Sequence, residues 1–106
     1  MNKVLLLGYV GKYPEIRYIG TRPVATFTMA TTEPARKLSN GTEVPERTEW
    51  HNMVMWDRSA EIAEKYIRKG TRLMCEGKIR TRSWEDKSAI KRYTTEIVVD
   101  NFELLK

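Results

Sequence analysis

Residues 48–70 read T-E-W-H-N-M-V-M-W-D-R-S-A-E-I-A-E-K-Y-I-R-K-G, and the spacing of apolar residues changes once within them. From Thr48 to Trp56 the period is two, which is typical of a strand with two different faces. From about Ser59 to Arg68 the period becomes helical, with Ala60, Ala63, Tyr66 and Ile67 at helical spacing. Asp57 or Ser59 is the expected N-cap, and Gly70 the expected end. The stretch predicts a strand followed by one short helix.

Two further strands are predicted before this stretch. Val4–Val10 and, after Pro14, Glu15–Ile19 read as one long strand with an interruption, for which Gly8 and Pro14 are the expected bend points. In the second strand, Val24–Thr31, the alternation places Ala25, Phe27 and Met29 on one face. The polar segment 32–46 then predicts a long hairpin, with a type I′ turn at Asn40-Gly41 near its tip.

Two strands are predicted after the helix. The first, Thr71–Arg82, places Leu73, Cys75 and Ile79 on one face, and a polar loop carrying Trp84 follows. The last is Tyr93–Val99, which Phe102–Leu105 extends. Five strands with one helix between the third and fourth predict an all-β protein, a five-stranded OB-fold Greek-key barrel formed by residues 1–106 as a single domain.

Composition excludes several classes of protein. A compact domain of 106 residues is expected to have a radius of gyration of about 13 Å. The apolar run Val4–Val10 is too short to span a membrane and no signal-peptide pattern surrounds it, so a soluble cytoplasmic protein is expected. With one cysteine and one histidine, the chain has neither an internal disulfide pair nor a ligand set for zinc. We therefore expect no metal and no cofactor.

The positive charge of the chain is concentrated in one segment. The net charge is +5, and residues 68–92, with nine basic and three acidic residues, contribute +6 of it. The other 81 residues sum to −1. A localised excess of this kind favours a polyanionic partner, although a solvated basic edge is the alternative.

Several stretches, taken in order, carry a resemblance to a known family. They are N-K-V-L-L-L-G at 2–8, P-E-I-R-Y at 14–18, T-E-W-H at 48–51, E-G-K-I-R-T-R at 76–82 and R-Y-T-T-E-I-V-V at 92–99. With these stretches the chain resembles bacterial single-stranded DNA-binding proteins of the homotetrameric type over nearly its whole length, except the 32–46 hairpin. The resemblance implies binding and protection of single-stranded DNA without sequence preference, in replication, recombination and repair at the nucleoid, and no catalysis.

The resemblance also assigns aromatic residues that stack on bases: Trp50, Trp56, Trp84 and Tyr66. Stacking on an aromatic ring contributes about 1–3 kcal/mol per base and tolerates any sequence, because every base has a π-face. The alternative is that Trp50 and Trp56 are core residues, since tryptophan is buried on average. Both share their strand face with polar Asn52, and Trp84 lies among charged residues, which favours the binding role.

Basic residues are assigned to the phosphates. Four basic residues at even-numbered positions of the fourth predicted strand fall on one face, as neutralisation of phosphates along a groove requires: Arg72, Lys78, Arg80 and Arg82. Five more basic residues are plausible phosphate contacts, with an ordinary surface charge as the alternative for each: Lys3, Arg17, Arg58, Lys69 and Arg92.

Other residues are assigned to packing or to contacts between subunits. By resemblance, His51 lies at a subunit contact, on the strand face opposite Trp50. The apolar start of the first strand is expected to pair across a subunit edge through Val4, Leu5, Leu6 and Leu7. No orienting partner or nucleophile accompanies His51, and Cys75 alternates with Leu73 as a small buried residue, so neither predicts a catalytic site.

The chain departs from the family at two places. Where relatives usually have a further tryptophan, this sequence has Glu33-Pro34-Ala35, and residues 33–49 carry a net charge of −1, so the hairpin is expected to hold DNA less firmly. The family's flexible linker and acidic tip do not follow Lys106, so recruitment of replication and repair enzymes through such a tail is not expected for this chain. Two alternatives remain open, a primosomal replication-restart OB-fold protein and an OB-fold module that binds a protein.

Overall fold

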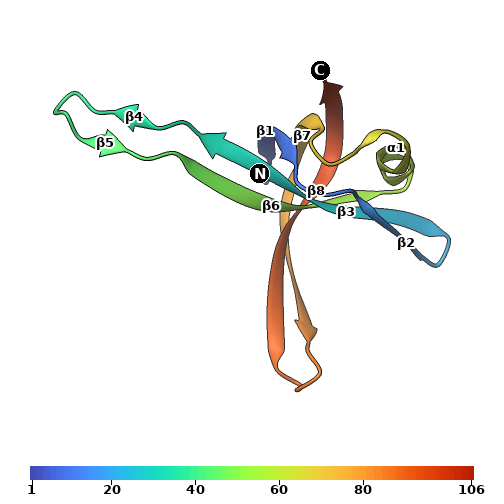
Figure 1. The fold of residues 1–106 in the computed structure, drawn as a ribbon. Helices are drawn as coiled ribbons and strands as arrows, with labels where there is room; N and C mark the ends of the chain where they lie inside the picture. The colour runs from blue at the N-terminus through green and yellow to red at the C-terminus, as the bar shows by residue number, and fades with distance from the viewer.

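Strands make up most of the chain, and a computed structural model describes all 106 residues (Figure 1). The elements follow in the order β1 (Val4–Val10), β2 (Glu15–Ile19), β3 (Arg22–Glu33), β4 (Arg36–Lys37), β5 (Glu43–Val44), β6 (Arg47–Trp56), α1 (Arg58–Tyr66), β7 (Arg72–Glu85) and β8 (Lys91–Leu105). The predicted first strand is thus two strands, β1 and β2, and the long hairpin carries the short pair β4 and β5 near its tip.

The main sheet closes into a barrel. Its strands are hydrogen-bonded in the order β1-β7-β8-β6-β3-β2, and β1 also pairs with β3 through Tyr9 and Val10. All neighbours are antiparallel except β6 and β8, which run parallel at Met53 and Val54. With β1 and β2 counted as one interrupted strand, this is a five-stranded barrel with the helix after the third strand. The predicted OB-fold is confirmed.

The interior of the barrel follows the predicted alternation. Strand β3 contributes Ala25, Phe27 and Met29, and β6 contributes Met53 and Met55, all almost completely buried. From β7 come Leu73 and Cys75, and α1 and the residue after it cover one end of the barrel with Ala60, Ala63 and Ile67. Burial in this core raises the pKa of the Cys75 thiol to about 12, so the predicted role of Cys75 as a small apolar residue is confirmed.

Two glycines allow strands to approach more closely than a side chain would permit. A Cβ at Gly8 would lie 2.0 Å from the carbonyl oxygen of Ala30, and one at Gly77 would lie 2.2 Å from that of Val98. Gly8 therefore sits inside β1 where it passes β3, and its role is close approach of the backbones.

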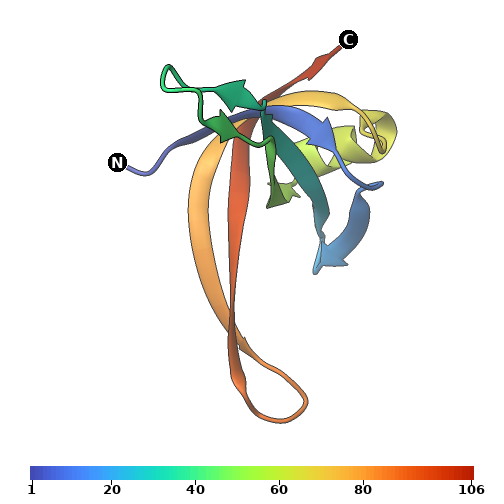
Figure 2. The same cartoon turned by 60° about the vertical axis from the view of Figure 1, so that its left-hand side comes forward.

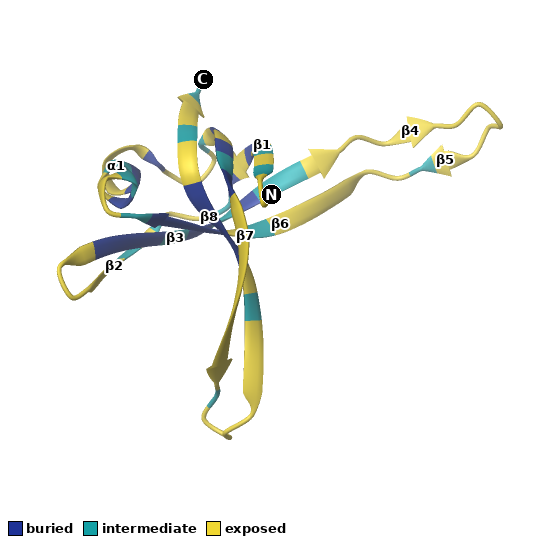
Figure 3. Cartoon of the chain, turned by 180° about the vertical axis from the view of Figure 1, so that it is seen from behind, coloured by how far each residue is buried: buried dark blue, intermediate teal, exposed yellow.

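Two hairpins extend beyond the barrel. In Figures 1 and 2, the tips of β7–β8 and of β3–β6 project in different directions, and Figure 3 shows both tips exposed while the buried residues gather where the strands cross. The radius of gyration is 16.3 Å, larger than the roughly 13 Å expected of a compact chain of this length. The expectation was wrong because it assumed that every strand remains in the barrel wall.

The same projection corrects two predictions on β7. Ile79 was expected to face inward with Leu73 and Cys75, but its side chain is 48% exposed, because past Gly77 only β8 continues beside β7. Trp84 was expected in a loop, but it lies within β7, where it pairs with Arg92 of β8. The ladder between the two strands extends as far as Glu85 and Lys91.

The helix begins and ends earlier than expected. It spans Arg58–Tyr66 and stops before Gly70, which lies beyond it with a positive φ of 88°. Asp57 occupies the N-cap position without capping through its side chain, because its carboxylate binds Arg22 instead. Tyr66, the last residue of the helix and one of the predicted stacking residues, is exposed. No helix of the chain is both long and apolar enough to cross a bilayer.

The turn at the tip of the long hairpin also differs from its prediction. A type I′ turn needs two central residues with positive φ, but only Gly41 has one, at 89°. The amide of Gly41 donates to the carbonyl of Leu38, and the Asn40 side chain accepts from the Thr42 amide. The hairpin therefore turns at the predicted place, but through a three-residue loop between Leu38 and Thr42 that ends in a glycine of positive φ.

Gly8→Ala should lower the free energy of unfolding by about 2 kcal/mol or more, because the added methyl group meets a backbone carbonyl that cannot move aside. Urea unfolding followed by far-UV circular dichroism measures this. Gly11→Ala is the matched control, since its Cβ would meet mainly the ring of Trp50, an exposed side chain that can rotate. Equal stability of Gly8→Ala and the wild type would contradict this explanation of barrel closure.

Candidate nucleic-acid interface

An open cleft runs over the outside of the barrel, across β2, β3, β6, β7 and β8. Two adjoining hollows form it. One is lined by Arg17, Ile19, Val24, Thr26, Val54, Trp56, Arg80, Arg82 and Glu96. The other shares Arg17, Thr26, Val54, Arg82 and Glu96, and adds Lys12, Phe27, Thr28, Asn52, Met53 and Thr94. We call these two hollows the barrel cleft.

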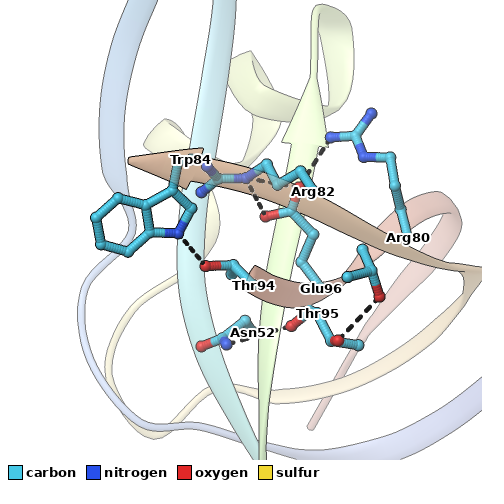
Figure 4. Close-up of polar contacts among 8 residues, drawn as sticks. Asn52, Arg80, Arg82, Trp84, Thr94, Thr95 and Glu96 are labelled. Carbon is cyan, nitrogen blue, oxygen red and sulfur yellow. Dashed lines mark hydrogen bonds and ion pairs between the residues drawn. The ribbon is translucent and has the colours of Figure 1, made fainter. Parts of the chain in front are cut away.

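A cluster of three charged residues lies in the barrel cleft. Arg80 and Arg82 alternate on β7, and Glu96 stands directly opposite Arg80 on β8. The Arg80 guanidinium donates to Glu96 Oε1 at 2.9 Å, and Arg82 Nε lies 3.4 Å from both carboxylate oxygens (Figure 4). Both guanidinium groups remain largely exposed while the carboxylate is buried. The cluster thus presents cations to solvent above a buried anion.

Trp84 adjoins this cluster. Its indole Nε1 donates to Thr94 Oγ1 at 2.9 Å, and Thr94 itself lines the barrel cleft (Figure 4). The side chain is 44% exposed. The hydrogen bond fixes the edge of the ring and leaves ring surface open to solvent, which is how an aromatic residue is held for stacking on a planar ligand.

Trp56 lies at the end of β6 beside Arg22, which sequence reasoning did not single out. The Arg22 guanidinium lies 4.5 Å from the centre of the indole ring. Asp57 holds that guanidinium through two hydrogen bonds, of 3.0 Å to Oδ1 and 2.8 Å to Oδ2. These hydrogen bonds hold the pKa of Asp57 below its usual value. One side of Trp56 is therefore covered by a cation, and the residue also lines the barrel cleft.

Trp50 lies six residues before Trp56 on the same side of β6, about 20 Å away along the strand. Its side chain is 61% exposed, so it is not a core residue. The ring lies against Gly11, where a Cβ would come 2.4 Å from ring atom Cζ3. Gly11 thus leaves the space in which the indole rests.

The other predicted phosphate contacts are more scattered. Lys3 pairs with Glu76 at 3.1 Å, and Arg92 with Asp86 at 3.0 Å on the β7–β8 hairpin. Arg58 and Lys69 are exposed at the beginning of α1 and after its end, and Lys78 is exposed on β7 before Arg80. Among the nine predicted cations, the barrel cleft brings together Arg17, Arg80 and Arg82.

Tyr66 lies in a different place from the tryptophans. It lines a separate hollow with Tyr9 and Arg72, next to Gly70 and the end of β8. The structure therefore puts the predicted stacking residue Tyr66 and the predicted phosphate contact Arg72 side by side, away from the barrel cleft.

The predicted subunit-contact residues lie on another face of the chain. Along Val4–Leu7, strand β1 pairs with β7 on one side only, and Leu5 is 69% exposed. Leu5, Leu6 and Leu7 line an apolar hollow with Met74 and Phe102. His51 faces away from Trp50, partly buried, with Nε2 2.8 Å from Thr31 Oγ1.

Sequence reasoning missed residues whose importance depends on a neighbour across the sheet. These are Lys12, Gly11, Arg22, Thr94 and Glu96. For Glu96 and Thr94 a signal existed, since pairing the last two predicted strands as a hairpin places both opposite the basic residues of β7. Arg22 had none, because its contact with Trp56 comes from the pairing of β3 with β6.

Exposed indoles beside cations can bind a ligand that has both flat rings and negative charge. The rings offer surface for stacking, and the guanidinium groups offer hydrogen-bond donors for phosphate oxygens. The cleft is open and extends over several strands, so it suits an extended chain of such units better than one small molecule.

Comparisons with known proteins agree with this geometry. Residues 1–105 match the model of the single-strand binding protein family. A single-stranded DNA-binding protein of Bacteroides thetaiotaomicron is 56% identical over 106 residues, which cover 99% of this chain and 66% of that protein. The chain thus spans slightly less than two thirds of that relative's length.

A solved structure gives a similar result. The Plasmodium falciparum SSB complex with ssDNA superposes with a TM-score of 0.89 and 33% sequence identity, covering 100% of this chain and 96% of that one. The fold and the sequence lead to the same family, and the resemblance inferred from the sequence is confirmed. The chain belongs to the single-strand binding protein family.

Proposed function

We propose that this protein binds and protects single-stranded DNA without sequence preference, by stacking bases on tryptophans and pairing phosphates with arginines. The observation that carries the proposal is the barrel cleft, where Trp56, Arg80 and Arg82 lie together and Trp84 adjoins them through Thr94. The relatives support it, because one is a single-stranded DNA-binding protein and another is a complex with ssDNA.

The lack of sequence preference follows from the groups that face the cleft. Stacking depends on the flat face of a base and not on its hydrogen-bonding edge, so the indoles accept all four bases. Guanidinium groups bind phosphates, which are the same in every nucleotide. Trp50, Trp84 and Trp56 are the proposed stacking residues, and Tyr66 with Arg72 forms a further contact for a strand that continues around the barrel.

We propose that the protein acts as a homotetramer. The edge of β1 at Val4–Leu7 is unpaired and apolar, and such an edge is suited to pairing with a second copy. The apolar hollow beside it, which includes Met74 and Phe102, adds surface for burial between copies. His51 is the proposed polar residue at the same interface.

The proposed cellular role is that of the family, in DNA replication, recombination and repair at the nucleoid. The role is one of binding, with no chemical step. A base that is stacked on an indole cannot at the same time stack on its neighbours in a duplex, so bound DNA is kept from reannealing while it stays accessible from solvent.

Trp50→Ala should weaken binding of an oligo-thymidine strand by about 1–3 kcal/mol, because one base loses its stacking partner. The melting temperature should change little, since the ring is exposed. Quenching of tryptophan fluorescence during titration with the oligonucleotide measures the affinity. Tyr18→Ala is a matched control, as Tyr18 is equally exposed on β2 and alternates with Arg17, which lines the cleft. A collapse of the melting temperature in Trp50→Ala, or no loss of affinity, would contradict the role.

Arg80→Ala should make binding less sensitive to salt. Each phosphate contact contributes about −0.7 to the slope of log Kobs against log salt concentration for a single strand, so the slope should become shallower by about that amount. Fluorescence anisotropy of a labelled oligo-thymidine strand over a sodium chloride series measures it. Lys65→Ala, which removes an exposed cation from the last turn of α1, should leave the slope unchanged. If Arg80→Ala also leaves it unchanged, Arg80 does not meet phosphate.

Leu5→Glu should reduce the mass of the protein in solution, because a charged side chain on the edge of β1 opposes pairing with a second copy. Sedimentation equilibrium, with and without a long oligonucleotide, measures the assembly. Leu38→Glu provides the control, since Leu38 is exposed at the far hairpin tip. A wild-type protein that sediments as a monomer would refute the tetramer.

A further inference from the structure

Glu96 is the one charged residue that the chain buries. Its side chain is 5% exposed, and it lies in the wall of the barrel cleft, where a polyanion is proposed to bind. A carboxylate repels phosphate, so its presence at this place calls for an explanation. The explanation lies in its two partners, which Figure 4 shows reaching the carboxylate from the same strand.

The Glu96 carboxylate orients Arg80 and Arg82, and the two arginines balance its buried charge. Arg80 donates to Oε1 at 2.9 Å, and Arg82 Nε reaches both oxygens at 3.4 Å. The two arginines would repel each other on alternate positions of one strand face without an anion between them. Glu96 therefore holds them in place, with guanidinium donors still directed to solvent.

The same pairing limits what the arginines can give to DNA. The three side chains carry a net charge of +1 and not +2. Both guanidinium groups can keep their contacts with Glu96 and still present free donors to phosphate, but a second phosphate would place another negative charge beside the buried carboxylate with no cation left to balance it. One phosphate restores neutrality while every ion pair with Glu96 remains.

We infer that Glu96 is a positioning residue that sets the number of phosphates neutralised by Arg80 and Arg82 to one. This inference rests on the proposed function and adds to it a residue that determines affinity. The electrostatic part of the binding free energy is smaller than two arginines without Glu96 would provide, so stacking contributes a larger share of the affinity. Weaker electrostatic binding also favours faster dissociation of the strand.

Glu96→Gln tests the inference, since glutamine has the same shape and retains an oxygen that accepts from Arg80. The variant should bind an oligo-thymidine strand about fivefold more tightly at 0.1 M salt, with a salt slope steeper by about 0.7, as expected for one more phosphate contact. Anisotropy of the labelled strand over a sodium chloride series gives both quantities. Thermal unfolding of the variant shows whether it is folded.

Glu64→Gln is the matched control. It makes the same change in net charge on the exposed surface of α1, outside the barrel cleft, so its slope should equal that of the wild type. An unchanged or shallower slope for Glu96→Gln, or an equal steepening in both variants, would overturn the inference.

A second variant serves if Glu96→Gln does not fold. The triple variant Arg80→Gln, Arg82→Gln, Glu96→Gln removes all three charges and leaves none unpaired. The inference requires its slope to be shallower than that of the wild type by about 0.7, the loss of one contact, whereas two independent arginines would lose about 1.4. A wild-type protein that binds no single strand overturns the proposed function as well. One that binds, with a loss of 1.4 in the triple variant, overturns only the role of Glu96.

Discussion

The barrel depends on two places where backbones pass each other with no side chain between them. Gly8 of β1 lies against the carbonyl of Ala30, and Gly77 of β7 lies against that of Val98. At the first place β1 joins β3 and closes the sheet. At the second, β7 and β8 bend out of register, with one extra residue in β8 between the two pairings. Glycine is required at both because any Cβ would overlap a carbonyl oxygen.

Closure of the barrel determines which side chains face outward as well as which form the core. Once Met53 and Met55 of β6 face the interior, their neighbours Asn52 and Trp56 must face outward, because successive side chains on a strand alternate. Past Gly77 the β7–β8 pair leaves the barrel wall, but Arg82 and Thr94, the hydrogen-bond partner of Trp84, still line the same hollow as residues of β6. The barrel cleft is therefore a result of the same geometry that forms the core.

Much of this arrangement could be predicted from the sequence because it depends on local periodicity. The alternation in 24–31 and 48–56 predicted the buried faces of β3 and β6, and the change to helical spacing predicted α1. The exposure of Trp50 agrees with the polar Asn52 on its strand face. Whether these residues are buried or exposed follows from the spacing of apolar and polar residues next to them in the sequence.

The remaining features depend on neighbours across the sheet, which periodicity does not report. Ile79 has the right spacing to be buried, but no third strand covers it beyond Gly77. Tyr66 has helical spacing with Ala63, yet the helix ends at it and it faces outward. The partnership of Glu96 with Arg80 and Arg82 requires the register of β7 on β8, and that of Arg22 with Trp56 requires the register of β3 on β6.

The contact between Arg22 and Trp56 leaves only one face of the Trp56 ring free for stacking. Because the guanidinium, anchored by Asp57, occupies one face of the indole, a nucleobase has only the opposite face on which to settle. Trp56 therefore cannot be intercalated between two consecutive bases, and a stack of bases that reaches it must terminate there. The single strand would thus be bound as separate short runs of stacked bases, one of which ends at the start of α1.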